Sequence, residues 1–399
     1  MSGCRLAIIA DDLSGALDTA APFAARGADT RVVISLEALA ATLEAWQGQW
    51  PEVIAVNTES RHLEAEQAVF RVNAAVRLLE QTNAQQWFKK IDSTLRGQVV
   101  AECTALREVL GFPLLLAPAV PAQGRTVRDA EVWVDGLPLA ATAYQQDARS
   151  TPLIGPIDHS FSASGLPLQR YYPGREAPLP SEDCIADAES DEELSALYTL
   201  MLDAGGKRAM AGAAGLATAI AQHGFRQNCF GQAQASFRKL DSVNAVLYAV
   251  GSRSPRAAGQ LQLLRDRAPD LAVIKACSAT PLERGHALSA CVVVPGEESE
   301  LTASQVASAM AAQVASITFS WRQNEECLLF LTGGDIAMAV LSALGVGYIN
   351  VETEWAPGVA LGYLDGDQQR RVITKAGGFG DPQLLLRLHR ELKFAQTAL

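Results

Sequence analysis

The chain has 399 residues, of which 49% are hydrophobic and 19% are charged. This length exceeds what one hydrophobic core usually supports, so we expect two domains. The formal net charge of −11 argues against non-specific binding to nucleic acid or to an anionic membrane.

In the first half of the chain, short apolar runs alternate with stretches of helical periodicity. This pattern is typical of α/β layering with largely parallel sheets. The predicted strands span residues 5–10, 30–35, 52–57, 87–91, 113–119 and 183–187, and the predicted helices 14–25, 63–80, 99–111 and 191–204. Residues 120–180 interrupt the alternation: they hold many Pro and Gly residues and two strand-like pieces. We expect a long irregular excursion there, of the kind that often carries function.

A second series of strands and helices follows the polar stretch 226–244. The predicted strands span residues 245–250, 271–276, 290–295, 327–332, 347–351 and 371–374, and the predicted helices 254–267, 301–315, 336–344 and 382–396. We place the boundary near 230–245, which gives domains 1–235 and 236–399. The expected fold is therefore α/β: two domains with mainly parallel sheets flanked by helices.

The cysteine content and the hydropathy of the chain indicate in which compartment the protein is expected. The seven cysteines are odd in number and form no Cys-x-x-Cys pair. We therefore expect neither a disulfide framework nor a structural zinc site, and we expect Cys184, Cys291 and Cys327 to behave as small buried hydrophobes. No run of 18 apolar residues and no secretion signal are evident, so we expect a soluble cytoplasmic protein.

The first candidate site segment is Ala-Asp-Asp-Leu-Ser-Gly-Ala-Leu-Asp at residues 10–18, which follows a strand and opens a helix. Ligands of open α/β sheets bind beyond the carboxyl ends of strands, so Asp11 and Asp12 are expected close to a ligand. We expect one carboxylate to face a ligand and the other to cap the helix or brace the loop. A competing interpretation is that Asp12 or Ser14 is only an N-cap.

The second segment is Asp-Ser-Thr-Leu-Arg-Gly at residues 92–97, which follows a strand ending in Lys-Lys-Ile. Lys90 and Arg96 supply positive charge, Asp92 a carboxylate, and the remaining residues two hydroxyls and a glycine turn. These groups suit a small hydroxylated anion. In the competing interpretation the segment starts a helix and its charges are solvated, but its position at a strand end favours the anion site.

Two further arginines follow predicted strands. Arg125, preceded by Gln123 and Gly124, can bind a carboxylate or a phosphate with two hydrogen bonds. Arg61 is a weaker candidate of the same kind. An ordinary surface loop is the competing interpretation for both, and the neighbouring His62 is expected at the surface.

Three glycine turns follow apolar strands in the second half: Gly251-Ser252, Gly333-Gly334-Asp335 and the segment 375–381. Backbone amides in such turns can surround phosphate groups, helped by helix N-termini. A single Gly-Gly pair would indicate little, whereas three such turns in one domain favour a nucleotide site.

Several common motifs are missing from the sequence. Neither a G-x-x-x-x-G-K-[ST] loop nor a G-x-G-x-x-G turn after the first strand occurs, which excludes a P-loop NTPase and a dinucleotide fingerprint. No H-E-x-x-H or G-x-S-x-G motif occurs, and the five histidines are scattered, which argues against a histidine metal centre.

Taken together, the motifs resemble those of the four-carbon acid sugar kinases, formerly a domain family of unknown function. The family's N-terminal motifs match residues 10–18, 90–97 and 118–125, and its nucleotide motifs match 251–252, 333–335, 357–359 and 375–380. The order is the same along nearly the whole chain. The resemblance implies an N-terminal sugar-acid domain, a C-terminal ATP domain and an active site in the interdomain cleft between them. It also implies phosphorylation of the terminal hydroxyl of threonate, erythronate or 3-oxo-tetronate, with ATP and Mg²⁺ as cofactors.

For such a kinase we expect alignment and charge neutralisation to dominate the chemistry. Lys90, Arg96 and Arg125 would hold the substrate carboxylate or the moving phosphoryl group. Asp12 or Asp92 would orient the acceptor hydroxyl and take its proton, and we favour Asp12 because Asp11 and Ser14 support it at a strand end.

The predicted site residues fall into three groups, and the sequence identifies no metal ligands. The predicted catalytic residues are Asp12, Lys90, Asp92 and Arg96. The predicted sugar-acid-binding residues are Asp11, Ser14, Gly15, Asp18, Arg61, Ser93, Thr94, Gly124 and Arg125. The predicted nucleotide-binding residues are Gly251, Ser252, Gly333, Gly334, Asp335, Ile336, Ala337, Gly358, Gly377 and Gly378.

The chain departs from the family pattern in places. Ile336 stands where the family usually has a hydroxyl residue, which would remove one phosphate contact, and the turn at 251–255 is atypical. Residues 150–180 lack the His- and Pro-rich segment associated with the 3-oxo-tetronate branch, which favours threonate or erythronate.

Two other functions stay open at this point. One is a non-catalytic sensor that binds a sugar acid and a nucleotide. The weaker one is a sugar-acid oxidoreductase, disfavoured by the missing dinucleotide fingerprint. The sequence also leaves open whether the protein is a homo-oligomer.

Overall fold

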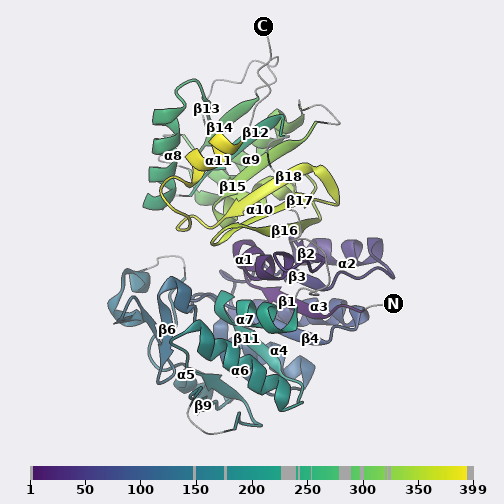
Figure 1. The fold of residues 1–399 in the computed structure, drawn as a ribbon, viewed down its shortest axis with the longest axis vertical. Coiled ribbons are helices and arrows are strands. Elements are labelled where there is room, and N and C mark those ends of the chain that lie inside the picture. The colour runs from purple at the N-terminus through teal and green to yellow at the C-terminus, as the bar shows by residue number, and fades with distance from the viewer. Residues whose placement is uncertain are drawn as a thin grey trace. The chain divides into compact units, whose positions relative to one another are not determined.

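The computed structural model describes residues 3–146, 150–174, 178–225, 240, 243–252, 254–277, 289–296, 301–319, 321 and 325–392. The contacts within the chain divide it into two compact units, Met1–Ala235 and Ser236–Leu399 (Figure 1). The predicted boundary region at 230–245 lies largely outside the described residues.

The first unit is built around a parallel sheet of short buried strands. In spatial order these are β2 (Thr30–Val33), β3 (Val53–Asn57), β1 (Leu6–Ala10), β4 (Gln86–Lys90), β11 (Ala209–Gly212), β5 (Leu114–Ala117), β10 (Cys184–Ala186) and β9 (Gln169–Tyr171). Ala10 is in register with Asn57 on one side and with Lys90 on the other. The segments that follow β1, β3 and β4 therefore start at the same edge of the sheet.

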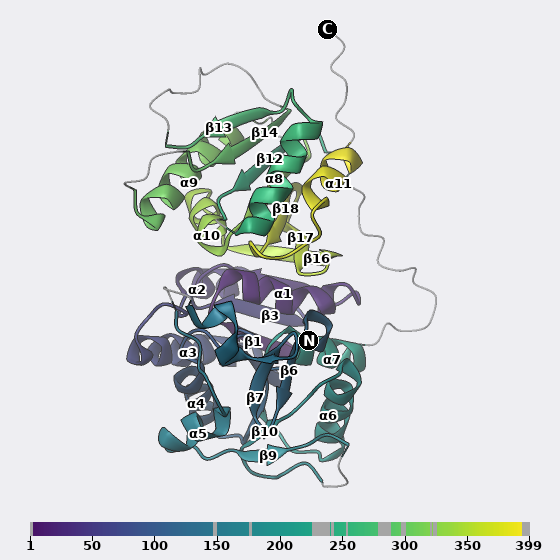
Figure 2. The same ribbon diagram turned by 90° about the vertical axis from the view of Figure 1, so that its left-hand side faces the viewer.

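Two rows of helices cover this sheet. One row holds α1 (Leu13–Ala24), α7 (Ala214–Gly224) and α6 (Asp191–Asp203), and the other holds α2 (Leu36–Ala45), α3 (Ala65–Leu79) and α4 (Val99–Leu110). Right-handed crossovers place the two rows on opposite faces. Figure 2 shows strands of this sheet between α3 and α4 on one side and α6 and α7 on the other. Helices on both faces explain why β1 and β3 are entirely buried.

The excursion after β5 is more regular than expected. It forms a small antiparallel sheet of β6 (Arg125–Arg128), β7 (Glu131–Val134) and β8 (Leu137–Pro138), followed by helix α5 (Ile157–Ala163) and β9. Asp135 and Gly136, with φ of 50° and 80°, close the turn between β7 and β8. An Asp-Gly pair is a strong hairpin signal that the sequence-based prediction overlooked.

The second unit also has a largely parallel sheet. The parallel strands, in spatial order, are β13 (Ala272–Lys275), β14 (Ala290–Val294), β12 (Ala245–Val250), β15 (Cys327–Thr332) and β18 (Asp367–Lys375). β17 (Val359–Leu364) and β16 (Tyr348–Ala356) continue it in antiparallel fashion beyond β18. Val250, Thr332 and Lys375 are in register, so β12, β15 and β18 end at one edge.

Four described helices flank this second sheet. α9 (Ala303–Phe319) packs against α10 (Gly334–Ala343), and α8 (Pro255–Arg267) packs against α11 (Leu384–Glu391). In Figure 2 the two pairs lie on opposite sides of the strands. The unit's apolar core is formed by strand residues such as Tyr248 and Phe330 together with Leu384 and Leu388 of α11.

The expected fold class is confirmed, since each unit has mainly parallel strands flanked by helices. Every predicted strand exists, with ends that differ by a few residues. The prediction missed α2, α7, β11 and β17, and it gave no bounds for elements such as α5 and β9 within residues 120–180. The last predicted helix, 382–396, is observed as α11, and its final residues lie outside the described part of the chain. Cys184, Cys291 and Cys327 are buried as predicted. None of the described helices is long and apolar enough to cross a membrane.

Candidate functional site

Arg61 connects the two aspartates that follow β1. Its Nε donates to Asp11 Oδ2 at 2.7 Å, and its Nη1 donates to Asp12 Oδ2 at 2.8 Å. Its Nη2 donates to the second oxygen of each carboxylate at 3.0 Å. Burial alone would raise the pKa of Asp11, but the charges of Arg61 and Lys89 outweigh it and hold that pKa below its usual value. The weakest candidate of the sequence analysis is therefore central to this cluster.

Asp12 has a second role as the N-cap of α1. Its Oδ1 accepts a hydrogen bond from the Gly15 backbone amide at 2.8 Å. Asp12 is thus an N-cap, as the competing interpretation predicts. It is not only an N-cap, because the same side chain also binds Arg61. A Cβ on Gly15 would lie 2.5 Å from Asp12 Oδ1 and 3.1 Å from Lys90 Nζ, so glycine is needed for this close approach.

Lys90 carries a buried positive charge beside these groups. It is the last residue of β4, is 5% exposed, and donates from Nζ to the Ile91 carbonyl at 2.8 Å. Within the described part of the chain, no carboxylate lies within ion-pair distance of its ammonium. A buried ammonium favours an anionic partner, so Lys90 is well suited to bind a ligand carboxylate or phosphoryl group.

The loop that follows β4 is organised around Asp92. Arg96 donates from Nε and Nη2 to the Asp92 carboxylate at 2.8 and 3.0 Å, and the Thr94 hydroxyl also bonds to it. Burial opposes ionisation of Asp92, but these hydrogen bonds and the charges of Arg61 and Arg96 hold its pKa well below the usual range. The interpretation that this segment caps a helix is wrong, since α4 begins at Val99 with Gln98 at its N-cap.

Gly97 brings the Asp92 loop against the Arg61 cluster. Its φ of 87° is in the left-handed region, and a Cβ there would lie 3.2 Å from Asp11 Oδ2. The Gly97 amide donates to Ser150 Oγ at 2.9 Å. The Leu153 amide donates to the Leu95 carbonyl at 3.0 Å, so residues of the excursion also hold this loop.

Beneath the aspartates lies a buried ion pair that sequence reasoning missed. Lys89 Nζ is 3.3 Å from Glu102 Oε2, and both side chains are at most 2% exposed. Ser60 bonds to the same carboxylate, while its amide donates to the Asp11 carbonyl at 3.0 Å. Side chains alternate along a strand, so Lys89 faces α4 while Lys90 faces Gly15 of α1. That alternation was the available signal that Lys89 and Lys90 lie on opposite faces of the sheet.

The other predicted residues of this unit are placed differently. Ser14 and Asp18 lie half-buried on α1, and Ser93 lies half-buried in the Asp92 loop. Arg125 donates to the Gln123 carbonyl at 2.6 Å and to the Tyr144 hydroxyl at 3.0 Å. Gly124, with φ of 71°, forms the turn before it. The structure thus joins Asp11, Asp12, Gly15, Arg61, Lys90, Asp92, Thr94, Arg96 and Gly97, and the contacts of Arg125 belong to its own region.

In the second unit the predicted glycine turns converge. Gly333, at φ 99°, is the N-cap of α10, and a Cβ there would lie 3.4 Å from the Ser252 amide. A Cβ on Gly377 would overlap Ser252 Oγ, and the Ser254 hydroxyl donates to the Gly377 carbonyl at 2.6 Å. The segments after β12, β15 and β18 are therefore in contact, as the register of those strands requires.

Neighbouring residues complete this turn cluster. Gly334, Asp335 and Ala337 form the first turn of α10, with Asp335 exposed. Gly358, in the β16–β17 turn, is packed against the ring of Phe379, and Gly378 is exposed. Ile336 is 5% exposed and packs against Gly251, which makes it a core contact of the turn. Arg253, part of the atypical turn, lies outside the described residues.

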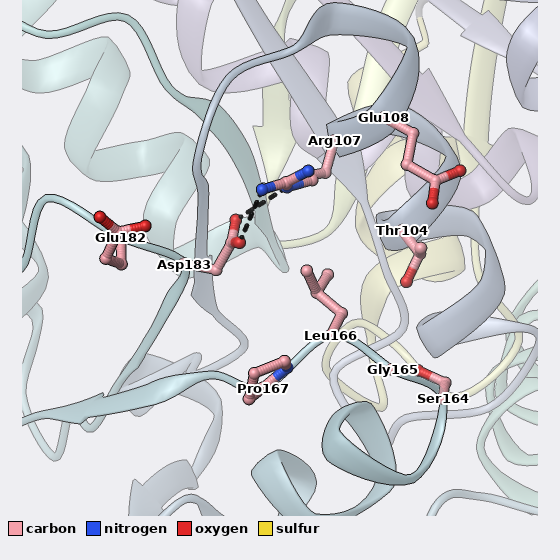
Figure 3. A pocket seen from close by; sticks show the side chains of 9 residues that line it. All are labelled: Thr104, Arg107, Glu108, Ser164, Gly165, Leu166, Pro167, Glu182 and Asp183. Atoms are coloured by element: carbon pink, nitrogen blue, oxygen red, sulfur yellow. Dashed lines mark hydrogen bonds and ion pairs between the residues drawn. The ribbon is translucent and has the colours of Figure 1, made fainter.

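A separate hollow of about 440 Å³ in the first unit contains none of the predicted residues (Figure 3). It lies at the amino ends of β5 and β10. There Arg107 donates two hydrogen bonds to the Asp183 carboxylate, at 3.1 and 3.2 Å. Asp183 already neutralises the charge of Arg107. The hollow also lies at the amino ends of the strands, whereas Asp12 and Asp92 follow the carboxyl ends. It is therefore not part of the candidate site.

These features define a two-unit α/β protein with a cluster of buried and half-buried charged side chains on one unit and a cluster of glycine turns on the other. Family models described as "Sugar-binding N-terminal domain" and "Nucleotide-binding C-terminal domain" match residues 6–153 and 247–385. The chain is 30% identical to the D-threonate kinase of Bordetella bronchiseptica over 98% of both chains, and 31% identical to that of Cupriavidus necator over 95% of both.

A solved structure agrees with the fold. The crystal structure of a Salmonella typhimurium LT2 protein matches with a TM-score of 0.78 at 18% identity, covering 98% of this chain and 100% of that chain. The chain therefore belongs to the family of two-domain sugar-acid kinases that includes these D-threonate kinases. The resemblance found in the sequence motifs is confirmed.

Proposed function

We propose that this protein transfers the γ-phosphoryl group of ATP to the terminal hydroxyl of a four-carbon sugar acid, with D-threonate as the first candidate. Near-full-length identity of 30–31% to two D-threonate kinases supports the reaction class and this choice. Erythronate and 3-oxo-tetronate are the other substrates that the family resemblance implies.

The buried ammonium of Lys90 carries this proposal. It lies beside Gly15 and Asp12 at the carboxyl edge of a parallel sheet, and no described carboxylate lies within ion-pair distance of it. Binding of an anion there would offset the free-energy cost of burying the charge. In the proposed complex Lys90 binds either the carboxylate of the sugar acid or the transferring phosphoryl group.

Asp12 is the base that we propose for the acceptor hydroxyl. Its side chain is 24% exposed, whereas that of Asp92 is 12% exposed and is held by Arg96 and Thr94. The more accessible carboxylate is better placed to meet a hydroxyl. The hydrogen bonds from Arg61 and the Gly15 amide would fix its orientation and thereby limit the loss of entropy on reaching the transition state. Asp92 and Arg96 would shape the loop that surrounds the acid.

The glycine turns of the second unit are the proposed nucleotide site. The Gly377 and Gly378 amides, which have no acceptor among the described residues, and the N-terminus of α10 suit phosphate oxygens. No cluster of three or more potential metal-ligating side chains occurs among the described residues. Mg²⁺ needs only one or two protein carboxylates when the nucleotide phosphates carry it, and Asp335, an exposed carboxylate on α10, would be such a ligand. When bound, the ion would neutralise charge on the phosphates.

A coupled ADP-release assay with a panel of four-carbon acids tests the proposal. The panel contains both enantiomers of threonate, both of erythronate, and 3-oxo-tetronate. We expect ADP release that depends on the acid, with the highest kcat/KM for D-threonate. Binding of an acid and of ATP without ADP release would replace the kinase with the non-catalytic sensor. Reduction of a nicotinamide cofactor in place of ADP release would favour the oxidoreductase.

A further inference from the structure

Lys375 is a buried lysine that the proposed reaction does not yet use. It is the last residue of β18, and its residue surface is 3% exposed. Its Nζ donates to three carbonyl oxygens that follow it in the chain: Ala376 at 3.1 Å, Gly377 at 3.1 Å and Phe379 at 3.0 Å. All three N–H donors of the ammonium are thus directed at one loop.

Other side chains bind the same carbonyl-rich face of this loop. Ser254 donates to the Gly377 carbonyl at 2.6 Å, and Gln260 donates to the Phe379 and Asp381 carbonyls at 3.2 and 2.7 Å. The donors come from α8 and from β18, so they fix the loop from two elements. Its carbonyls are consequently turned towards the protein.

The amides of the loop are left for another partner. Among the described residues, the Gly377 and Gly378 amides have no hydrogen-bond acceptor. Gly377 lies against Ser252, which places these amides within the glycine-turn cluster. An ammonium that gathers the carbonyls on one side therefore leaves N–H groups on a surface suited to anions.

We propose that Lys375 is a positioning residue for the nucleotide. Its ammonium folds residues 376–379 around itself and so presents the Gly377 and Gly378 amides to the nucleotide phosphates. This inference rests on the proposed function, because it assigns the phosphates to the second unit.

The surroundings of Lys375 make the device sensitive to pH. Burial and the charge of Arg256 on α8 lower the pKa of Lys375 to about 8. Of the other charged groups on adjoining elements, Asp381 is paired with Arg387 at 3.1 Å, and Asp335 on α10 is exposed. A neutral amine has fewer N–H donors and no charge, so the loop loses its anchor as the pH rises through about 8.

The experiment measures binding of MgADP by titration calorimetry to the full chain and to variants. Lys375→Met should weaken MgADP binding by about tenfold or more, which corresponds to the loss of hydrogen bonds to a charged group. Binding of D-threonate should change by less than about twofold, since the lesion is confined to the second unit. Lys275→Met is the matched control, because Lys275 also ends a strand of this sheet but is exposed.

A pH series on the unmodified protein keeps the inference testable even where Lys375→Met fails to fold. Between about pH 7 and about pH 9 the dissociation constant of MgADP should rise several-fold. Arg256→Gln should move the midpoint of this rise to higher pH, because removal of a neighbouring positive charge raises the pKa of Lys375. Lys375→Arg, which stays charged, should retain measurable binding without the rise.

The outcomes are distinguishable. Equal MgADP affinity of Lys375→Met and the unmodified protein would overturn the positioning role while leaving the nucleotide site intact. A pH-independent affinity between about pH 7 and about pH 9 would also overturn it. Failure of the unmodified protein to bind MgADP at all would overturn the proposed function together with this inference.

Discussion

Arg61 donates two parallel hydrogen bonds to the Asp11 carboxylate, from Nε to Oδ2 at 2.7 Å and from Nη2 to Oδ1 at 3.0 Å. The guanidinium also reaches Asp12, so one cation offsets two carboxylates at the end of β1. The carboxylate of Asp11 is 2% exposed, and it stays ionised because Arg61 is beside it. This pair therefore stabilises the folded first unit and, in the proposed reaction, supports the orientation of Asp12.

Arg61→Ala should destabilise the first unit by about 3–5 kcal/mol, since it leaves a buried carboxylate without its partner. Urea denaturation followed by circular dichroism measures the loss. Arg31→Ala is the matched control: Arg31 makes the same two-bond contact with Asp29, but Asp29 is 47% exposed. The control should cost about 1 kcal/mol or less. Equal losses for the two variants would show that Arg61 does not compensate a buried charge.

Gly15→Ala should lower kcat by about tenfold or more, because the added Cβ would push Asp12 Oδ1 or Lys90 Nζ out of place. Stability should change little, as alanine is the better helix former by about 1 kcal/mol. Steady-state kinetics with D-threonate and thermal melting measure the two effects. Gly259→Ala on α8 is the control, since a Cβ there meets nothing within 4 Å. Unchanged kcat in Gly15→Ala would remove Asp12 and Lys90 from the proposed site.

The sequence predicted the edge of the sheet at which these charged residues gather, but not the pairing among them. Strand ends and charged residues are visible in the chain, and register then brings Ala10, Asn57 and Lys90 together. Arg61 was ranked low because nothing local shows that its side chain reaches back to β1. That contact depends on the conformation of the loop after β3, which is a tertiary property.

The missed residues share a physical reason. Lys89 and Glu102 lie on consecutive elements and are ordinary residue types, and only the packing of α4 onto β4 brings them together as a buried ion pair. In the second unit Lys375 was read as part of a glycine turn, whereas its side chain organises that turn. Ile336 fills space against Gly251, a packing role that the sequence does not show, and the loss of a phosphate contact there stays a prediction. In each case the side chain's direction decided its role.

Asp92→Asn should destabilise the protein at neutral pH by about 1–3 kcal/mol, the usual range for hydrogen bonds to a charged group. Burial alone would raise the pKa of Asp92, but the hydrogen bonds and charges of Arg96 and Arg61 outweigh that effect. The folded-state pKa therefore lies below the unfolded value. Its contribution is therefore complete above the unfolded pKa of about 4 and declines as the pH falls further. The stability difference between the unmodified protein and the variant should accordingly shrink from pH ~6 to pH ~3 in urea titrations. A difference that grows on acidification would contradict the ion-pair account.

Asp12→Asn should reduce kcat by about a hundredfold or more, because it removes the proposed base and one of its hydrogen bonds from Arg61. The KM for ATP should change by less than about threefold, since the proposed nucleotide site is on the second unit. Asn keeps an oxygen for the Gly15 amide, so the helix cap survives. Asp92→Asn is the comparison in the same assay and should lower kcat less. A larger loss in Asp92→Asn than in Asp12→Asn would transfer the role of base to Asp92.

Gly377→Ala should raise the KM for ATP by about tenfold or more, because its Cβ would overlap Ser252 Oγ and force two of the glycine turns apart. D-threonate binding, measured calorimetrically without nucleotide, should be nearly unaffected. Gly378→Ala provides a graded comparison at the adjacent position, since a Cβ there meets nothing within 4 Å and the amide is retained. We expect its KM for ATP to rise by only a few-fold, in proportion to the smaller steric change. Equal KM values for ATP in Gly377→Ala and the unmodified protein would mean that contact between these turns does not shape the nucleotide site.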